Sequence, residues 1–263
     1  MPPAPIHLEH LTWPSIQSLQ AKSPRMRLLP TGATEQHGPH LPIHTDSLIA
    51  TRVCEEASAR TNVPLLPTLR YTQSTGHTTK WPGTFSLSHQ TFIETVVEIA
   101  TWAVNTGWER LLLVNSHFGN DAVLRIAVDR IRVALLGRFQ IGLLHTFQLT
   151  SAIWDYFISD GDDVHANRAE TDLLLHLAPE LVDQSALQDD PDRTSGTVFS
   201  YPVAQTSRNG LTGTPSLGTA EQGKELFQEM VDALTAKVEI AKIESPPLEH
   251  SAWEPLVSVN QSS

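Results

Sequence analysis

RLLLVNSHFGNDAVLRIAVDRIRVALLGRFQIGLLH, residues 110–145, is the most clearly patterned stretch of the chain. Arg110–Asn115 is a short, almost continuous apolar run, which is typical of a strand buried on both faces. Apolar residues then recur at helical spacing over residues 120–136, and Gly137 ends the pattern. Phe139–His145 returns to an apolar run. A strand, a helix and a second strand in this order predict a largely parallel sheet covered by helices, the α/β class.

The same alternation extends to both sides of this unit. Short strands are predicted at Arg27–Pro30, at Val63–Leu69 and near Thr197–Tyr201. Helices are predicted over residues 46–59, 92–107, 169–177 and 219–238. The last of them begins with Thr219 and Gln222 in the spacing of a capping box. No linker divides the chain, so we expect a single domain over residues 1–263.

The composition restricts the classes of protein that remain. Of the 263 residues, 40% are hydrophobic and 18% are charged, as is ordinary for a globular protein. The net charge of −11 argues against nucleic-acid binding through a general basic face. The single cysteine, Cys54, excludes an intrachain disulfide and a cysteine-based metal cluster. The sequence shows neither a signal peptide nor a membrane-spanning run, so we expect a cytoplasmic protein without a membrane partner.

Histidine is the unusual component, with 12 residues against 18 lysines and arginines. The densest polar segment is TGATEQHGPHLPIHTDS, residues 31–47, between a predicted strand and a predicted helix. Glu35 and His37 are two residues apart, so an extended backbone points them the same way. Asp46 follows nine residues after His37. This set of ligand types suits zinc, manganese or iron, and a solvated loop in which Asp46 caps the helix is the alternative.

Two further polar clusters lie next to predicted elements. NSHFGN, residues 115–120, places His117 at the carboxyl end of the central strand, where sites of open α/β sheets lie. His117 is a metal ligand or a hydrogen-bonded strand-end histidine, and the following helix start could instead bind an anion. DDVHANRAETD, residues 162–172, offers His165 and Glu170 near a helix start. They are a ligand and a proton-transfer group, or part of an acidic segment that complements the helix dipole.

Other histidines and the cysteine fit structural roles better. His77 lies in STGHTTKWPGTFSLS, residues 74–88, where it could approach a ligand, but spacing alone favours a surface loop. His40 flanks the first polar cluster and is expected to support the structure. Cys54 lies within a helical pattern, which predicts a small buried residue.

In chain order, these clusters resemble the creatininase (creatinine amidohydrolase) family. The resemblance rests on PTGATEQHGPHLPIHTD (residues 30–46), WPGT (81–84), NSHFGN (115–120) and HANRAET (165–171). These segments span most of residues 27–178, and the first is long and specific. The resemblance implies a three-layer α/β/α sandwich with a mostly parallel central sheet.

The resemblance also implies a divalent-metal site, usually with two ions per chain, for which zinc, manganese and iron are the candidates. The ligands that it implies are Glu35, His37, Asp46, His117 and Glu170, with Asp46 bridging both ions. His165 would then transfer a proton to the leaving nitrogen, and Glu170 is the second candidate for that role. The implied reaction is hydrolysis of a C–N bond in a small cyclic amide or formamide by metal-bound hydroxide. Family members are usually homo-oligomers, often hexamers, and we expect a homo-oligomer here.

One position departs from creatininase itself. Gly119 stands where creatininase has a metal-binding glutamate, and this form resembles the formamide-hydrolase and peptide-processing members more closely. Creatinine is therefore not the expected substrate. Two alternatives to a small-amide hydrolase stay open: a non-catalytic small-molecule-binding protein on the same scaffold, and a peptide-processing hydrolase in which residues 193–218 shape a groove.

Overall fold

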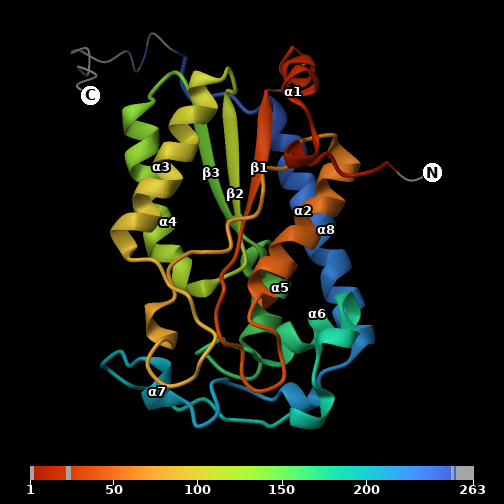
Figure 1. Ribbon diagram of the computed structural model, residues 1–263, viewed down its shortest axis with the longest axis vertical. Helices are drawn as coiled ribbons and strands as arrows, with labels where there is room; N and C mark the ends of the chain where they lie inside the picture. The colour runs from red at the N-terminus through yellow and green to blue at the C-terminus, as the bar shows by residue number, and fades with distance from the viewer. Residues whose placement is uncertain (1–2, 22–24, 250–251, 253–263) are drawn as a thin grey trace.

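Three parallel strands form the sheet of the protein (Figure 1). The computed structural model describes residues 3–21, 25–249 and 252. The strands are β1 (Met26–Thr31), β2 (Arg110–Asn115) and β3 (Gln140–His145), and β2 lies between the other two. Thr31 pairs with Asn115 and Asn115 with His145, so the three carboxyl ends meet at one edge of the sheet. The predicted parallel sheet is confirmed.

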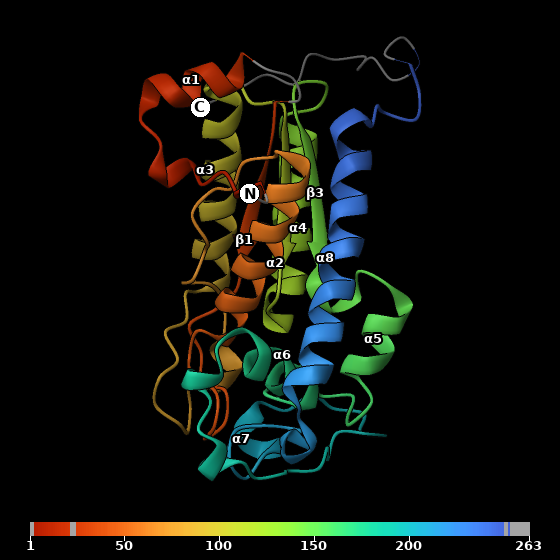
Figure 2. The same ribbon diagram turned by 90° about the vertical axis from the view of Figure 1, so that its right-hand side faces the viewer.

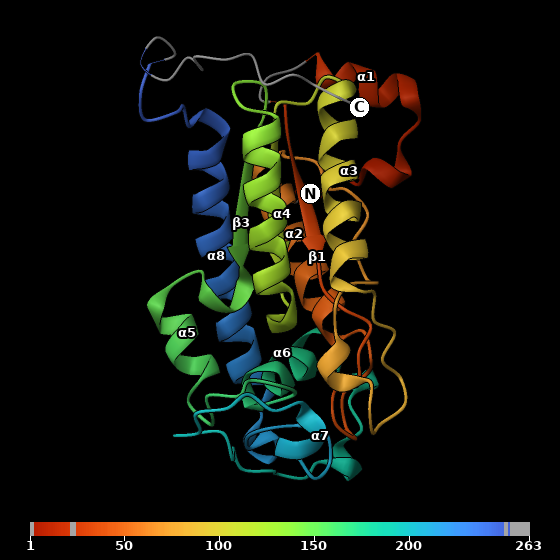
Figure 3. The same cartoon turned by 90° about the vertical axis from the view of Figure 1, so that its left-hand side faces the viewer.

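Helices cover both faces of this sheet. On one face lie α2 (Thr45–Thr61) and α8 (Ala220–Ile243), and on the other α3 (His89–Asn105) and α4 (Asp121–Ala134), as Figures 2 and 3 show from opposite sides. The side chains of β2 alternate between the two layers: Leu112 and Val114 pack toward α2 and α8, and Leu111 and Leu113 toward α3 and α4. This alternation explains the continuous apolar run of β2, and it confirms the three-layer α/β/α sandwich.

The remaining elements surround the carboxyl edge of the sheet or its opposite end. The other helices are α1 (Trp13–Gln20), α5 (Ser151–Phe157), α6 (Arg168–Leu177) and α7 (Val203–Thr206), and 3-10 turns occur at Leu8–His10, Thr75–His77, Phe118–Asn120, Thr146–Gln148, Pro179–Leu181, Gln184–Ala186 and Pro215–Leu217. Among the described residues, every helix is too short or too polar to span a lipid bilayer.

Helices α6 and α8 approach each other closely near the carboxyl edge. A Cβ on Gly223 of α8 would lie 1.8 Å from the backbone oxygen of Asp172 in α6, so only glycine fits this contact. The carboxylate of Asp172 accepts the backbone N–H of Thr219, the residue before α8, and the hydroxyl of Tyr156. These contacts fix α6, the helix that carries Glu170, against the start of α8.

Three local predictions were wrong. Residues 63–69 are not a strand: they run beside β1 and pair only through isolated bridges, because Pro64 and Pro67 have no N–H to donate. Residues 197–201 form no strand either, and Phe199 is 74% exposed, so no sheet buries this segment. The capping box is only half formed. The hydroxyl of Thr219 accepts the N–H of Gln222, but the side chain of Gln222 turns to Glu225.

Candidate metal centre

The five predicted ligands come together at the carboxyl edge of the sheet. The loop after β1 supplies Glu35 and His37, the first turn of α2 supplies Asp46, the end of β2 leads to His117, and the first turn of α6 supplies Glu170. All five residues are buried, none more than 4% exposed.

The loop after β1 returns to α2 because two backbone segments touch. A Cβ on Gly32 would lie 2.4 Å from the backbone nitrogen of Ser47, so a side chain at position 32 would push the loop away from the helix. The hydroxyl of Ser47 donates to the carbonyl of Ala33 and closes the same contact. This close approach sets Asp46 beside the loop residues Glu35 and His37.

The ligand atoms form two groups that share Asp46. One group contains Glu35, Asp46 and His117, and the other contains His37, Asp46 and Glu170. Within them, Asp46 Oδ1 lies 3.2 Å from His37 Nε2 and Asp46 Oδ2 lies 3.2 Å from His117 Nδ1. A carboxylate that offers one oxygen to each side is the geometry of a bridging ligand between two ions.

Each of the two imidazoles has one nitrogen free for a metal. Nδ1 of His37 lies 3.1 Å from the carbonyl oxygen of Glu35, which only accepts, so Nδ1 carries a proton. Nε2 faces the acidic groups and is the nitrogen that would bind a metal ion after losing its own proton. In His117 the two nitrogens exchange these roles. Nε2 lies 3.0 Å from the carbonyl oxygen of Gln73, and Nδ1 faces Asp46. A backbone carbonyl that holds the second nitrogen of a histidine is the common support of a metal ligand.

The carboxylates fit a cation better than they fit the protein around them. Both carboxylate oxygens of Glu35, Oδ2 of Asp46 and Oε2 of Glu170 are buried without a hydrogen bond. A buried carboxylate is costly unless a cation or hydrogen-bond donors compensate it. Three such groups around one centre, together with two imidazole nitrogens, match the oxygen and nitrogen ligands of zinc, manganese or iron.

Proton affinities in the site reflect the same excess of negative charge. Burial alone would lower the pKa of His37, but Asp46, Glu170 and Glu35 raise it to about 10. Burial also lowers the pKa of His117, but Glu35 and Asp46 raise it to about 9. Burial raises the pKa of the Glu170 carboxyl to about 7. Protons therefore compensate the carboxylates where cations do not, and metal uptake must release them.

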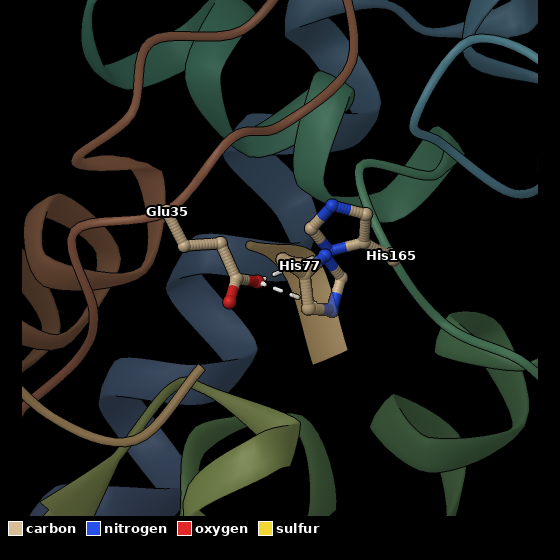
Figure 4. Close-up of side chains that lie close together, drawn as sticks. All are labelled: Glu35, His77 and His165. Carbon is tan, nitrogen blue, oxygen red and sulfur yellow. Dashed lines mark ion pairs between the residues drawn. The ribbon is translucent and has the colours of Figure 1, made fainter. Parts of the chain in front are cut away.

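His165 joins the site from the segment before α6 and lies beside Glu35 and His77. Its Nδ1 lies 3.3 Å from Oε1 of Glu35, and Nε2 of His77 lies 3.8 Å from the same oxygen (Figure 4). These three residues form a further group whose atoms could hold a cation. Burial and the neighbouring imidazoles of His77 and His37 keep the pKa of His165 well below its usual value, so the ring is neutral at pH 7.

Two residues of the site were missed by sequence reasoning. His77, which spacing assigned to a surface loop, reaches the site from the turn Thr75–His77. Gln36, between two predicted ligands, contacts both His77 and His165. The signal for His77 was its position four residues before the family-like WPGT segment at 81–84.

A cavity of about 310 Å³ opens onto these groups. Its wall includes Phe118, which stacks on Phe147 at a ring distance of 3.7 Å, and Gly119. A Cβ on Gly119 would lie 2.5 Å from His117 Nε2, so glycine leaves the space that the imidazole occupies. Asp163 lies at the same cavity and adds another carboxylate to its wall.

A comparison with known protein families decides the relationship. The family model described as creatininase, creatinine amidohydrolase, matches residues 9–238. The chain belongs to the creatininase family. The expected membership is thereby confirmed, and the family's hydrolase scaffold is the one described above.

Individual relatives within the family differ in their substrates. A mycofactocin precursor peptide peptidase of Mycobacterium ulcerans is 33% identical over 246 residues, which cover 86% of this chain and 85% of the relative. A creatinine amidohydrolase of Pseudomonas putida is 28% identical over 258 residues, which cover 92% and 98%. The family therefore includes enzymes named for a peptide and for a small cyclic amide.

Solved structures of creatininase share the fold. A tryptophan-to-phenylalanine variant has a TM-score of 0.82 at 26% identity, covering 91% of this chain and 100% of its own. A manganese form has a TM-score of 0.80, covering 91% and 100%, and a form described as Zn-Zn has 0.78, covering 91% and 99%, both at 26% identity. These two neighbours are described as zinc and manganese forms, and the ligand types of this site suit both metals.

Proposed function

We propose that this protein is a metal-dependent amidohydrolase that cleaves the C–N bond of a small cyclic amide or formamide. The observation that carries the proposal is the pair of ligand groups that share Asp46 and contain buried carboxylate oxygens without hydrogen bonds. Glu35 and His117 would hold one divalent ion, His37 and Glu170 the other, and Asp46 both. Two ions so held supply Lewis acidity toward a carbonyl and activate water near neutral pH.

The residues of the chain then bind, orient and exchange protons around the scissile bond. Glu170 is the first candidate to accept a proton from the attacking water and return it to the leaving nitrogen, because its buried carboxyl lies at the cavity in the ligand group of Asp46. His165 is the second candidate for contact with that nitrogen, because its ring lies at the cavity beside Glu35. The burial of both residues limits competing contacts with bulk water.

The size of the cavity supports a small substrate. About 310 Å³ is near the lower limit for pockets that bind small molecules. One observation favours the peptide-processing alternative: a relative that is 33% identical is named as a peptidase. A small cavity could take one terminal residue of a peptide, so a substrate panel must contain both classes.

Metal analysis of the purified protein tests the proposal first. Without chelators in the preparation, we expect about two ions per chain, and about one or none in His37→Ala and Glu170→Ala. His89→Ala and Glu98→Ala are matched controls, because both side chains are exposed on α3, away from the site. Controls that keep two ions while the site variants lose them support the ligand assignment.

Substrate screening then distinguishes the reactions. The zinc- or manganese-loaded protein is assayed against cyclic amides, formamides and short peptides, and turnover of the first two classes that disappears in His37→Ala supports the proposal. Turnover of peptides alone favours the peptidase alternative. Tight binding of a small amide without turnover favours the binding-protein alternative, and failure to bind any metal refutes the hydrolase.

A further inference from the structure

The side chain of Gln36 is buried and contacts both of the histidines that are drawn in Figure 4. Its oxygen lies 3.0 Å from the backbone nitrogen of Gly38. Its nitrogen lies 2.9 Å from the carbonyl oxygen of Gly210, 2.9 Å from Nε2 of His165 and 3.2 Å from Nδ1 of His77. One side chain thus connects the loop after β1, the loop before α8 and both histidines.

Two backbone groups fix the orientation of this amide. The N–H of Gly38 can only donate, so the atom facing it is the amide oxygen, and the carbonyl of Gly210 can only accept, so the atom facing it is the amide nitrogen. Exchange of the two amide ends would oppose donor to donor and acceptor to acceptor. The site therefore determines the direction of the amide, independently of the histidines.

This direction determines the tautomer of His165. An amide NH₂ group only donates, so Nε2 of His165 must accept and the ring proton lies on Nδ1. Nδ1 is the nitrogen that faces Glu35 at 3.3 Å. The amide nitrogen of Gln36 has two protons but three acceptors within reach. It lies closer to the Gly210 oxygen and to Nε2 of His165 than to Nδ1 of His77, so the contact with His77 is the weakest of the three.

We propose that Gln36 is a positioning residue that holds His165 as a neutral Nδ1–H hydrogen-bond donor toward Glu35, at the wall of the cavity. The nitrogen that faces Glu35 then has no lone pair, so Glu35, His77 and His165 do not bind a third metal ion although their atoms are close together. A neutral imidazole N–H can polarise a carbonyl or stabilise a leaving nitrogen. Proton transfer is then left to Glu170. The catalytic part of this inference rests on the proposed amidohydrolase function.

Nuclear magnetic resonance of zinc-loaded protein with ¹⁵N-labelled histidine tests the tautomer directly. Long-range ¹H–¹⁵N correlations of His165, assigned by their loss in His165→Asn, are expected to show a protonated Nδ1 and an unprotonated Nε2. Gln36→Glu has the same shape but accepts where the amide donates, so we expect its ring proton on Nε2. Gln17→Glu adds the same charge on an exposed position of α1 and should leave the wild-type pattern.

The result is separable from the proposed function, because the tautomer and the zinc count need no substrate. A protonated Nε2 in the wild type, or a third zinc ion per chain that is lost in His165→Asn, would overturn the inference even if the protein hydrolyses amides. If no amide is hydrolysed but Nδ1 is protonated, the proposed function fails and the role of Gln36 in fixing the tautomer stands. In an active enzyme, Gln36→Glu should lower kcat by about 100-fold with little change in KM.

Discussion

Replacing Gly119 with alanine should disable the metal centre through a single steric contact. The added Cβ would lie 2.5 Å from Nε2 and 3.1 Å from Cε1 of His117. Ordinary contacts begin near about 3.5 Å, so the imidazole must move by about 1 Å. Metal–ligand distances tolerate only about 0.2 Å, so the predicted movement is several times larger than the site can accept.

Two quantities follow from this displacement. Zinc affinity should fall by at least about 10- to 100-fold, the usual cost of disturbing the support of a ligand. Crowding of the site should also lower the free energy of unfolding of the metal-free protein by about 1–3 kcal/mol. In a chain of this size each kcal/mol lowers the melting temperature by about 2–4 °C.

The assay compares Gly119→Ala with Gly76→Ala. Gly76 lies in the turn that carries His77, and a Cβ there would meet nothing within 4 Å, so it controls for the chemical change alone. Zinc affinity is measured by competition with a chelator, and stability by thermal unfolding of both metal-free variants. If Gly119→Ala binds zinc as tightly as Gly76→Ala, the steric account of this position is wrong.

Three further predictions concern the helices and the protons around the centre. Gly223→Ala should lower the free energy of unfolding by more than about 3 kcal/mol, because the added Cβ would overlap the backbone of Asp172. An unchanged midpoint of denaturant unfolding would contradict the contact between α6 and α8. Asn167→Ala should cost about 1–2 kcal/mol and weaken metal binding, since its side chain caps α6; stability equal to wild type would exclude that role. The raised pKa values keep His37 and His117 protonated at pH 7, so each zinc ion must displace about one proton when it binds. Zinc affinity should therefore rise about tenfold per pH unit between about pH 6 and 8. Calorimetric titrations that show no dependence of the affinity on pH would refute this prediction.

The local pattern of the sequence was sufficient to predict a parallel sheet covered by helices, and the family resemblance added the three-layer arrangement. Residues 111–114 are a continuous apolar run, which predicts a strand buried on both faces, and apolar spacing predicts the helices that the structure places at 121–134 and 220–243. The same reasoning failed at 63–69, where the apolar residues are present but two prolines remove the donors of a ladder. Apolar pattern reports burial, whereas a strand also needs backbone hydrogen bonds.

For the candidate site, the sequence motifs and the family resemblance that they carry were enough to predict the ligand types and their order along the chain. The motifs around Glu35, His117 and Glu170 were legible because each follows or begins a patterned element. The family resemblance already implied Asp46 as the shared ligand, and the structure places it in two ligand groups. Only the tertiary structure decided that His77 and Gln36 belong to the site. The physical reason is that the contacts of Gln36 join segments far apart in the chain: His77 is 41 residues away and Gly210 is 174 residues away. Packing, and not local sequence, brings such segments together.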